Sequence, residues 1–275
     1  MAINRRIELI DFSEKNSELL QVVYQHQNNA TITRINAEFH NDYLIVAFPE
    51  LEDLLSAINQ RIRKLQIIHY SYFGDLSENA LAGSAASLPF EANYQFHYNT
   101  NSFSSNISFN TAVFYREVID NQFQTFILTA AAIFENIVRL VEKLTKKVVL
   151  HHTNRKPPSV PLGMYLNYLD SLLRLNYRNV NPFVQCLLNH ESFLRTYVET
   201  VNFLRNSYIH GYKSNLVLNS GRYMISKLEA PLTSTTPQAE AKFFTEDFTE
   251  GMIEFFTELL ETLIAEVSTS ADLPF

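Results

Sequence analysis

The residues best suited to chemistry lie in the segment FLRNSYIHGY, residues 203–212, which places Arg205, Asn206 and His210 within two helical turns. Imidazole titrates near neutral pH, so His210 can act as a general base or a general acid. The guanidinium of Arg205 is a planar fork that keeps its charge and suits a phosphate group. The amide of Asn206 can orient the histidine or a phosphate oxygen. These three residue types together suit chemistry at a phosphate.

An amphipathic helix is predicted over residues 191–210, and it must position these side chains. Its apolar stripe, at steps of three and four, consists of Leu194, Val198, Val201, Leu204 and Tyr208. Its polar stripe consists of Ser192, Arg195, Glu199, Asn202, Asn206 and His210. Arg205 lies at the border, about 140° around the helix from His210. A solvated helix face has the same pattern, and a histidine near a helix C-terminus suits the helix dipole, so a purely structural role stays open.

The segment RNSYIH resembles the motif of the HEPN superfamily, helical domains that carry an arginine, four to six residues and a histidine where a bundle helix ends. The FENI segment with Glu135 is similar to a carboxylate position of many such domains. The spacing alone is weak evidence, because two other segments, residues 34–40 and 63–69, also begin with an arginine and end with a histidine within the spacing that the motif allows. Only the RNSYIH match adds Asn206, a following glycine and a helix end. The resemblance covers about residues 113–267.

The resemblance implies metal-independent RNA cleavage, without a cofactor, in a homodimer whose two motifs face across one cleft. We therefore predict as catalytic residues Arg205, Asn206 and His210. We predict as supporting residues Glu135, Glu199, Asn202 and Tyr208. The expected role is a toxin or phage-defence effector with RNA as substrate and an antitoxin or inhibitor protein as partner. The alternatives are a non-catalytic helical dimer that binds nucleic acid or acts as a scaffold, and an unrelated helical interaction protein.

Composition limits the class of protein. Of 275 residues, 46% are hydrophobic and 19% charged, as in a folded globular chain. The net charge of −7 argues against a general nucleic-acid coat, so any RNA site must be local. Only six glycines are present, and they form neither a P-loop nor a Rossmann fingerprint.

Cysteine and histidine usage limits the sites. A single cysteine, Cys186, fits a reducing cytoplasm and leaves no cysteine-based zinc cluster, and the adjacent His151 and His152 lack metal-ligand spacing. Cys186 itself is interpreted as a buried small hydrophobe. No apolar run predicts a signal peptide or a membrane span. We expect a soluble cytoplasmic protein that is not bound to a membrane and holds no metal.

The expected fold class is mainly α. Residues 111–275 are predicted to form a HEPN-like up-and-down helical bundle with a small β-hairpin insertion, and residues 1–110 an N-terminal α/β segment of uncertain fold. The strands expected in the N-terminal segment are residues 6–12, 31–39 and 43–49, the last two as a hairpin. The helices expected along the chain are residues 13–25, 51–73, 114–150, 162–175 and 243–267. An Asn- and Ser-rich linker is expected at residues 77–110, and the inserted hairpin at residues 216–228.

Overall fold

The computed structural model describes residues 8–27, 42–74, 111–145, 182–211, 216–219, 222–226 and 239–269. Within these ranges the side chains left undescribed are those of residues 26, 27, 42–49, 111–116, 141–143, 145, 182–184, 210, 211, 218 and 269. Helix accounts for 88% of the described residues, and the sheet in this part of the chain has two antiparallel strands. The chain is therefore mainly α, as predicted.

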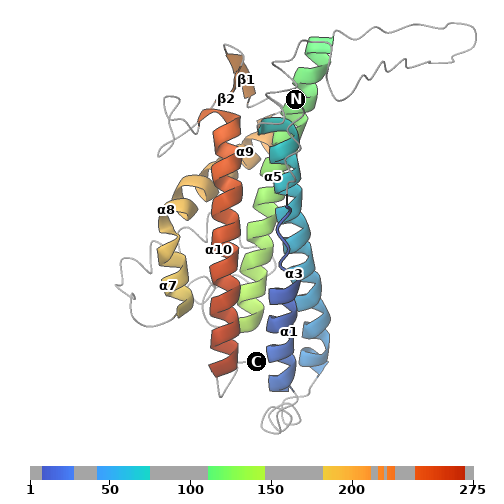
Figure 1. The fold of residues 1–275 in the computed structure, drawn as a ribbon, viewed down its shortest axis with the longest axis vertical. Helices are drawn as coiled ribbons and strands as arrows, with labels where there is room; N and C mark the ends of the chain where they lie inside the picture. The colour runs from blue at the N-terminus through green and yellow to red at the C-terminus, as the bar shows by residue number, and fades with distance from the viewer. Residues whose placement is uncertain are drawn as a thin grey trace, which may run out of the picture.

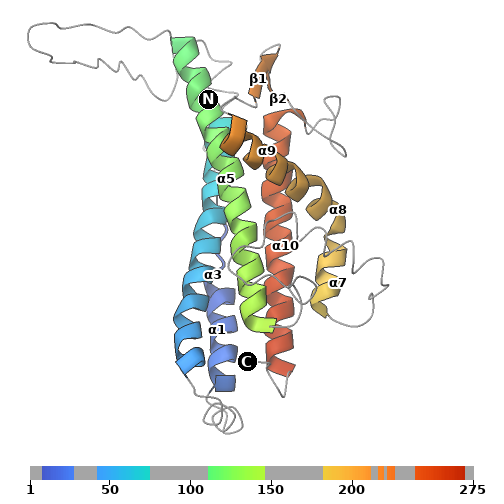
Figure 2. The same cartoon turned by 180° about the vertical axis from the view of Figure 1, so that it is seen from behind.

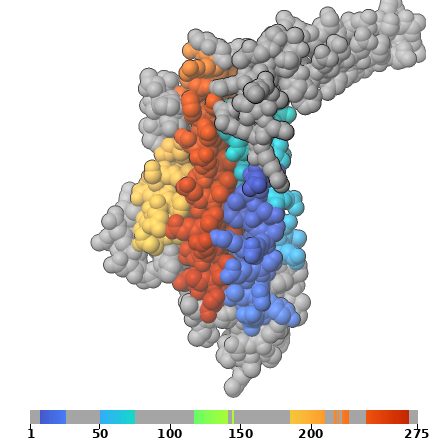
Figure 3. Space-filling view, viewed as in Figure 1, coloured from blue at the N-terminus to red at the C-terminus, as the bar shows by residue number. Residues whose placement is uncertain are grey.

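Four long helices stand side by side and form the body of the molecule (Figure 1). They are α1 (Ser13–Gln27), α3 (Asp42–Ile68), α5 (Thr111–Thr145) and α10 (Ala241–Thr269). A π-helical turn, η1 (His69–Phe73), continues α3. α1 runs opposite to α3, since Ile10 bonds to Gln66 and Asn16 bonds to Leu55. On the face shown in Figure 3, α1 lies alongside α10.

One aromatic-rich core joins these helices. Phe123 and Phe126 of α5 contact Phe244 and Phe248 of α10, with ring centroids 6.1 and 5.6 Å apart. Phe12, before α1, meets Phe256 of α10 edge to face at 5.0 Å. The buried residues of α1 and α3 belong to the same cluster as those of α5 and α10. The described helices on both sides of the boundary predicted between residues 110 and 111 thus share a core.

The strand predicted at residues 6–12 is wrong for the part that the structure describes. Residues 8–12 run alongside α3 without strand pairing, and side chains of α3 satisfy their backbone groups. The Ile10 N–H donates to Gln66 Oε1 at 2.8 Å, the Phe12 N–H donates to Asn59 Oδ1 at 3.1 Å, and Arg63 Nε donates to the Ile10 carbonyl at 2.9 Å. Because these bonds replace a strand ladder, residues 8–12 form a strap along α3.

Asp11 ties this strap to the start of α1. Its Oδ1 accepts hydrogen bonds from the Ser13 N–H at 3.0 Å and the Ser13 hydroxyl at 2.6 Å, and from Asn59 Nδ2 at 3.1 Å. Arg63 forms an ion pair with the same carboxylate. These donors, Ser13 first, hold the pKa of Asp11 well below its usual range. The helix begins at Ser13, as predicted.

The predicted strand at residues 43–49 is also wrong, because this run forms the first turns of α3. A short apolar run does not by itself distinguish a strand from a buried helix, and the amphipathic sequence that follows extends the helix backwards through it. The helix predicted at residues 51–73 is confirmed as the rest of α3 with η1. The expected strand at 31–39, linker at 77–110 and helix at 162–175 lie outside the described residues.

A second group of shorter helices packs against one side of α10 and then crosses α5 (Figure 2). They are α7 (Pro182–Asn189), α8 (Glu191–Phe193), the π turn η2 (Leu194–Val198) and α9 (Glu199–Gly211). α7 begins at Pro182, whose missing N–H costs nothing in a first helical turn. These elements supply the scaffold of the candidate site.

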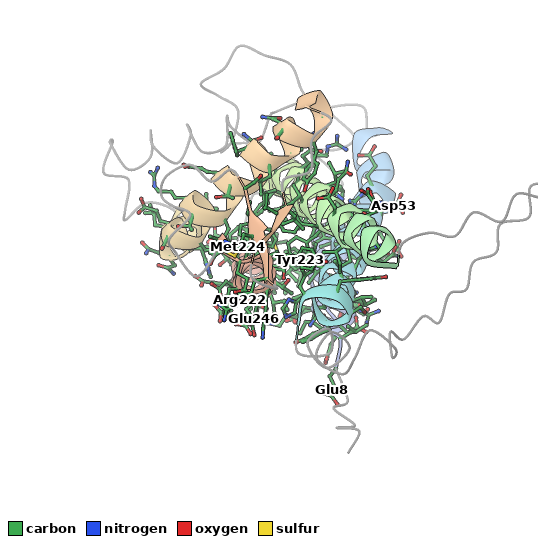
Figure 4. The ribbon with its side chains drawn as sticks, turned by 90° about the horizontal axis from the view of Figure 1, so that it is seen from above. Glu8, Asp53, Arg222, Tyr223, Met224 and Glu246 are labelled. Carbon is green, nitrogen blue, oxygen red and sulfur yellow. The ribbon has the colours of Figure 1, made fainter. Side chains whose placement is uncertain are left out.

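The predicted hairpin is confirmed as β1 (Leu216–Asn219) and β2 (Arg222–Ile225). Asn219 pairs with Arg222 across the turn, and Leu216 pairs with Ile225. β2, whose Arg222, Tyr223 and Met224 are labelled in the view from above (Figure 4), contacts α10, and Met224 forms an isolated β-bridge with Glu240. Arg222 also pairs with Glu240 at 3.5 Å. The hairpin thus packs at one end of the bundle.

Candidate functional site

The arginine–histidine motif lies in the last two turns of α9, which ends at Gly211. Of the five residues of the predicted apolar stripe, Tyr208 is half-buried and the other four have 0% exposure, namely Leu194, Val198, Val201 and Leu204. α9 packs on α5. Because Leu204 faces the core, Arg205 lies half-buried at the edge of the contact and Asn206 lies on the exposed face.

Arg205 forms an ion pair with Glu135 of α5. The distance between Arg205 Nη2 and Glu135 Oε1 is 2.9 Å, and the side chains expose 28% and 34% of their surface. Glu135 sits between Phe134 and Asn136, which are both buried, so the backbone of α5 is fixed at this point. Two residues separated by 70 positions in the sequence are thus brought into direct contact at the surface.

The remaining predicted residues are spread along α9. Glu199 and Asn202 are partly exposed, and Tyr208 is half-buried against the core. His210 lies in the last turn of α9, but its side chain is outside the described part of the chain. The structure therefore brings Arg205 together with Glu135 and leaves Asn206 exposed one residue further on.

A π turn interrupts the regular spacing assumed for this helix. Residues 194–198 form η2, and a π turn contains an additional residue compared with an α turn. The predicted polar stripe is therefore continuous from Glu199 to the motif but is broken between Arg195 and Glu199. Arg195 instead pairs with Glu191, one turn earlier, at 2.8 Å.

Contacts between the π turn and α10 were not predicted from the sequence. The Tyr197 hydroxyl donates to Asp247 Oδ2 at 2.8 Å. Burial, followed by this hydrogen bond and the charge of Asp247, raises the pKa of Tyr197 above its usual range. No local spacing connects residues 50 positions apart, so the sequence carries no signal for this pair.

The other arginine-to-histidine segment in the described part of the chain, residues 63–69, has a structural role, because both its arginine and its histidine contact other parts of the bundle. Arg63 bonds to the strap at Ile10 and Asp11. His69 is buried at 5% exposure in η1, and its Nδ1 lies 2.9 Å from the Thr245 hydroxyl of α10. Both residues of this match thus hold the bundle together. The match at residues 34–40 lies outside the described residues.

Cys186 is buried at 1% exposure, in agreement with the predicted structural role. Burial, aided by the negative charge of Glu258, raises the pKa of the Cys186 thiol to about 12, which leaves it protonated and a poor nucleophile at neutral pH. Glu258 accepts from Asn189 at 2.7 Å and lies 2.9 Å from His190 Nε2, which joins the α7–α8 corner to α10. In the part of the chain that the structure describes, no group of three or more His, Cys, Asp or Glu residues could hold a metal ion. His151 and His152 are not in that part.

No family model, curated protein or solved structure matches this chain. Within the described residues, the segment Glu117–Leu140 of α5 is long and apolar enough to span a membrane. However, 67% of its most apolar window is buried against the other helices, which is typical of the core helix of a soluble protein.

Proposed function

We propose that this protein is a metal-independent endoribonuclease of the HEPN type, and that Arg205, Asn206 and His210 form its catalytic site. The observation that carries the proposal is the ion pair between Arg205 and Glu135 beside the exposed Asn206, at the end of α9. A guanidinium that pairs with a partly exposed carboxylate at the surface lies where another anion, such as a phosphate, can reach it. Its neighbours supply the other groups that RNA cleavage requires.

Cleavage of RNA without a metal needs three functions. A base must remove the proton of the 2′-hydroxyl, and we assign this role to His210, whose imidazole can also return a proton to the leaving oxygen. A cation must hold the phosphate as its charge increases, and we assign this role to Arg205. A hydrogen-bond donor must fix the geometry, and the exposed amide of Asn206 suits this purpose.

The proposed assembly is a homodimer in which the ends of both α9 helices line one groove. Two-fold dimers are the commonest protein assemblies, and a groove between two helix ends can use residues on either side of each helix. We further propose a cytoplasmic toxin or phage-defence role, with an antitoxin or inhibitor protein as its partner. The negative net charge of −7 supports a local RNA site rather than a coat along the RNA.

The test is cleavage of a mixed RNA pool by the full chain, with and without EDTA. His210→Ala should lower the rate by at least about 10²-fold, the lower end of a general base's contribution. Arg205→Lys should also lose activity, because an ammonium cannot replace a bidentate fork. Arg195→Lys is the matched control, since Arg195 also pairs with a glutamate and exposes 31% of its side chain.

These variants separate the possible explanations. Equal activity of the wild type and His210→Ala removes the histidine from the site, and loss of activity in EDTA refutes the metal-free mechanism. Equal loss in Arg195→Lys and Arg205→Lys would indicate a general charge effect. Circular dichroism of each variant checks that the fold is kept, as expected because neither Arg205 nor His210 belongs to the apolar stripe.

The second candidate function is a non-catalytic helical module that binds nucleic acid or acts as a scaffold. The same ion pair favours it, because a guanidinium already neutralised by a carboxylate resembles an ordinary contact between two helices. Wild-type protein that cuts no RNA and is harmless when expressed would make this module the better assignment.

A further inference from the structure

Glu135 pairs with one arginine across the helix contact and is followed by a second arginine four residues later on its own helix. It pairs with Arg205 of α9 at 2.9 Å. Arg139 follows it on α5 at the i+4 position and is exposed to solvent. A glutamate followed by an arginine four residues later is the favoured orientation for an ion pair within one helix. The carboxylate thus has one cationic partner across the helix contact and a second candidate on its own helix.

We propose that Glu135 is an electrostatic gate on anion binding at Arg205. In the structure, the Glu135 carboxylate is paired with Nη2 of the Arg205 guanidinium. When an RNA phosphate binds, it displaces the carboxylate, which then pairs with Arg139 instead. The inference rests on the proposed function, since it assumes that Arg205 is the phosphate-binding group of the site.

An exchange of this kind requires an ion pair that is not buried and whose interaction energy is not negligible. Arg205 and Glu135 expose 28% and 34% of their side chains, so water reaches both groups and no charge is stranded when the pair opens. Ion pairs with such exposure are weak, whereas a phosphate can accept two parallel hydrogen bonds from a guanidinium. A phosphate can therefore compete with the carboxylate, but its affinity is reduced while the carboxylate remains.

The presence of Arg139 lowers the cost of opening the gate. Without a second partner, the displaced carboxylate would lie beside the incoming phosphate and repel it. Pairing with Arg139 would keep the charge of the carboxylate compensated along α5. The Glu135 carboxylate therefore has two alternative partners, Arg205 when no phosphate is bound and Arg139 when a phosphate is bound. Two such states are the requirement for a switch.

The experiment measures the affinity of the full chain for a fluorescent 2′-O-methyl oligoribonucleotide, which cannot be cut because its 2′-hydroxyls are blocked. Fluorescence anisotropy at fixed low salt gives the Kd. Glu135→Gln should tighten binding about two- to fivefold, the range expected for loss of one partly exposed charge contact. Glu191→Gln is the matched control, because it removes the same charge from the Glu191–Arg195 pair, in which the glutamate exposes 36% and the arginine 31% of its side chain. This variant should leave the Kd within about 1.5-fold of the wild-type value.

A double-mutant cycle tests the role of Arg139. Arg139→Gln should weaken binding in the wild type and have a much smaller effect in the Glu135→Gln background, because the gate is already open there. Equal weakening in both backgrounds would mean that Arg139 contacts the RNA itself, and this would overturn the exchange. Unchanged or weaker binding by Glu135→Gln would overturn the gate.

Cleavage of an ordinary RNA, measured on the same variants, keeps this inference separate from the proposed function. If RNA is cut but Glu135→Gln does not bind the blocked oligonucleotide more tightly, the gate is wrong and the ribonuclease assignment stands. If Glu135→Gln binds more tightly but no variant cuts, the gate stands and the catalytic assignment fails. Absence of binding in both the wild type and Glu135→Gln overturns the gate and the RNA site together.

Discussion

Gly251, in the middle of α10, gives a sharp test of how the scaffold of the site is packed. A Cβ added at this position would lie 2.5 and 2.6 Å from Cδ2 and Cε2 of the Phe193 ring. Carbon atoms in ordinary contact are about 3.5–4.0 Å apart, so the ring would have to move by roughly 1 Å. Gly251→Ala is therefore the perturbation of choice, because it introduces a single methyl group against a single ring.

The expected effect is the difference between two opposing terms. Alanine is favoured over glycine inside a helix by about 1 kcal/mol. Overpacking costs about 1–3 kcal/mol, and the upper part of this range applies because the Phe193 ring is surrounded by other aromatic rings. Those rings belong to Phe134, Tyr197, Phe248 and Phe255. We therefore expect Gly251→Ala to lower the free energy of unfolding by about 1–2 kcal/mol.

The assay is urea unfolding of the full chain followed by circular dichroism, combined with a double-mutant cycle. In a Phe193→Ala background the obstructing ring is gone, so the same Gly251→Ala change should become stabilising by about 0.5–1 kcal/mol. Glu250→Ala, at the exposed neighbouring position, controls for a general effect on α10. A stabilising Gly251→Ala in the wild type, or the same effect in both backgrounds, would refute the packing argument.

Three further predictions concern the rest of the scaffold. Leu204→Ala should lower the free energy of unfolding by about 2–5 kcal/mol, whereas Asn206→Ala on the exposed side of α9 should change it by less than about 0.5 kcal/mol, as measured by urea unfolding. Asp11→Asn should lower Tm at neutral pH. The folded-state pKa of Asp11 is depressed, so the carboxylate stabilises the fold at pH values above the usual carboxyl pKa of 3.8, and this stabilisation is lost as the pH falls below 3.8. The difference in Tm between Asp11→Asn and the wild type should therefore shrink at acidic pH. A difference in Tm that stays constant at all pH values would contradict this. Tyr197→Phe should destabilise by about 1–2 kcal/mol through loss of the hydrogen bond to the Asp247 carboxylate, and an unchanged unfolding midpoint would show that this bond contributes nothing.

Much of the helical architecture follows from the sequence, because apolar periodicity reports which side of a helix faces the core. The spacing of Leu194, Val198, Val201 and Leu204 predicted a buried stripe, and all four are buried. The final helix and the hairpin around Asn219 and Arg222 are likewise encoded by local pattern and turn residues.

Local pattern was insufficient wherever the partner of a segment decided its structure. Residues 8–12 have the composition of a strand, but their backbone groups are satisfied by Asn59, Arg63 and Gln66 of α3, which no periodicity reveals. Residues 43–49 form an apolar run that is compatible with strand or helix, and the helix that continues through them resolved the choice.

The sequence by itself determined which residue types stand at the end of α9 and which side of that helix is buried. The resemblance of RNSYIH and FENI to one family singled out Arg205 and Glu135, but it did not place them in contact. Only the tertiary structure decided that their side chains meet at 2.9 Å, that a π turn precedes α9, and that Phe193 lies against Gly251. The physical reason is that helix periodicity is encoded over a few neighbouring residues, whereas contacts between helices depend on how several apolar faces fill one core at the same time.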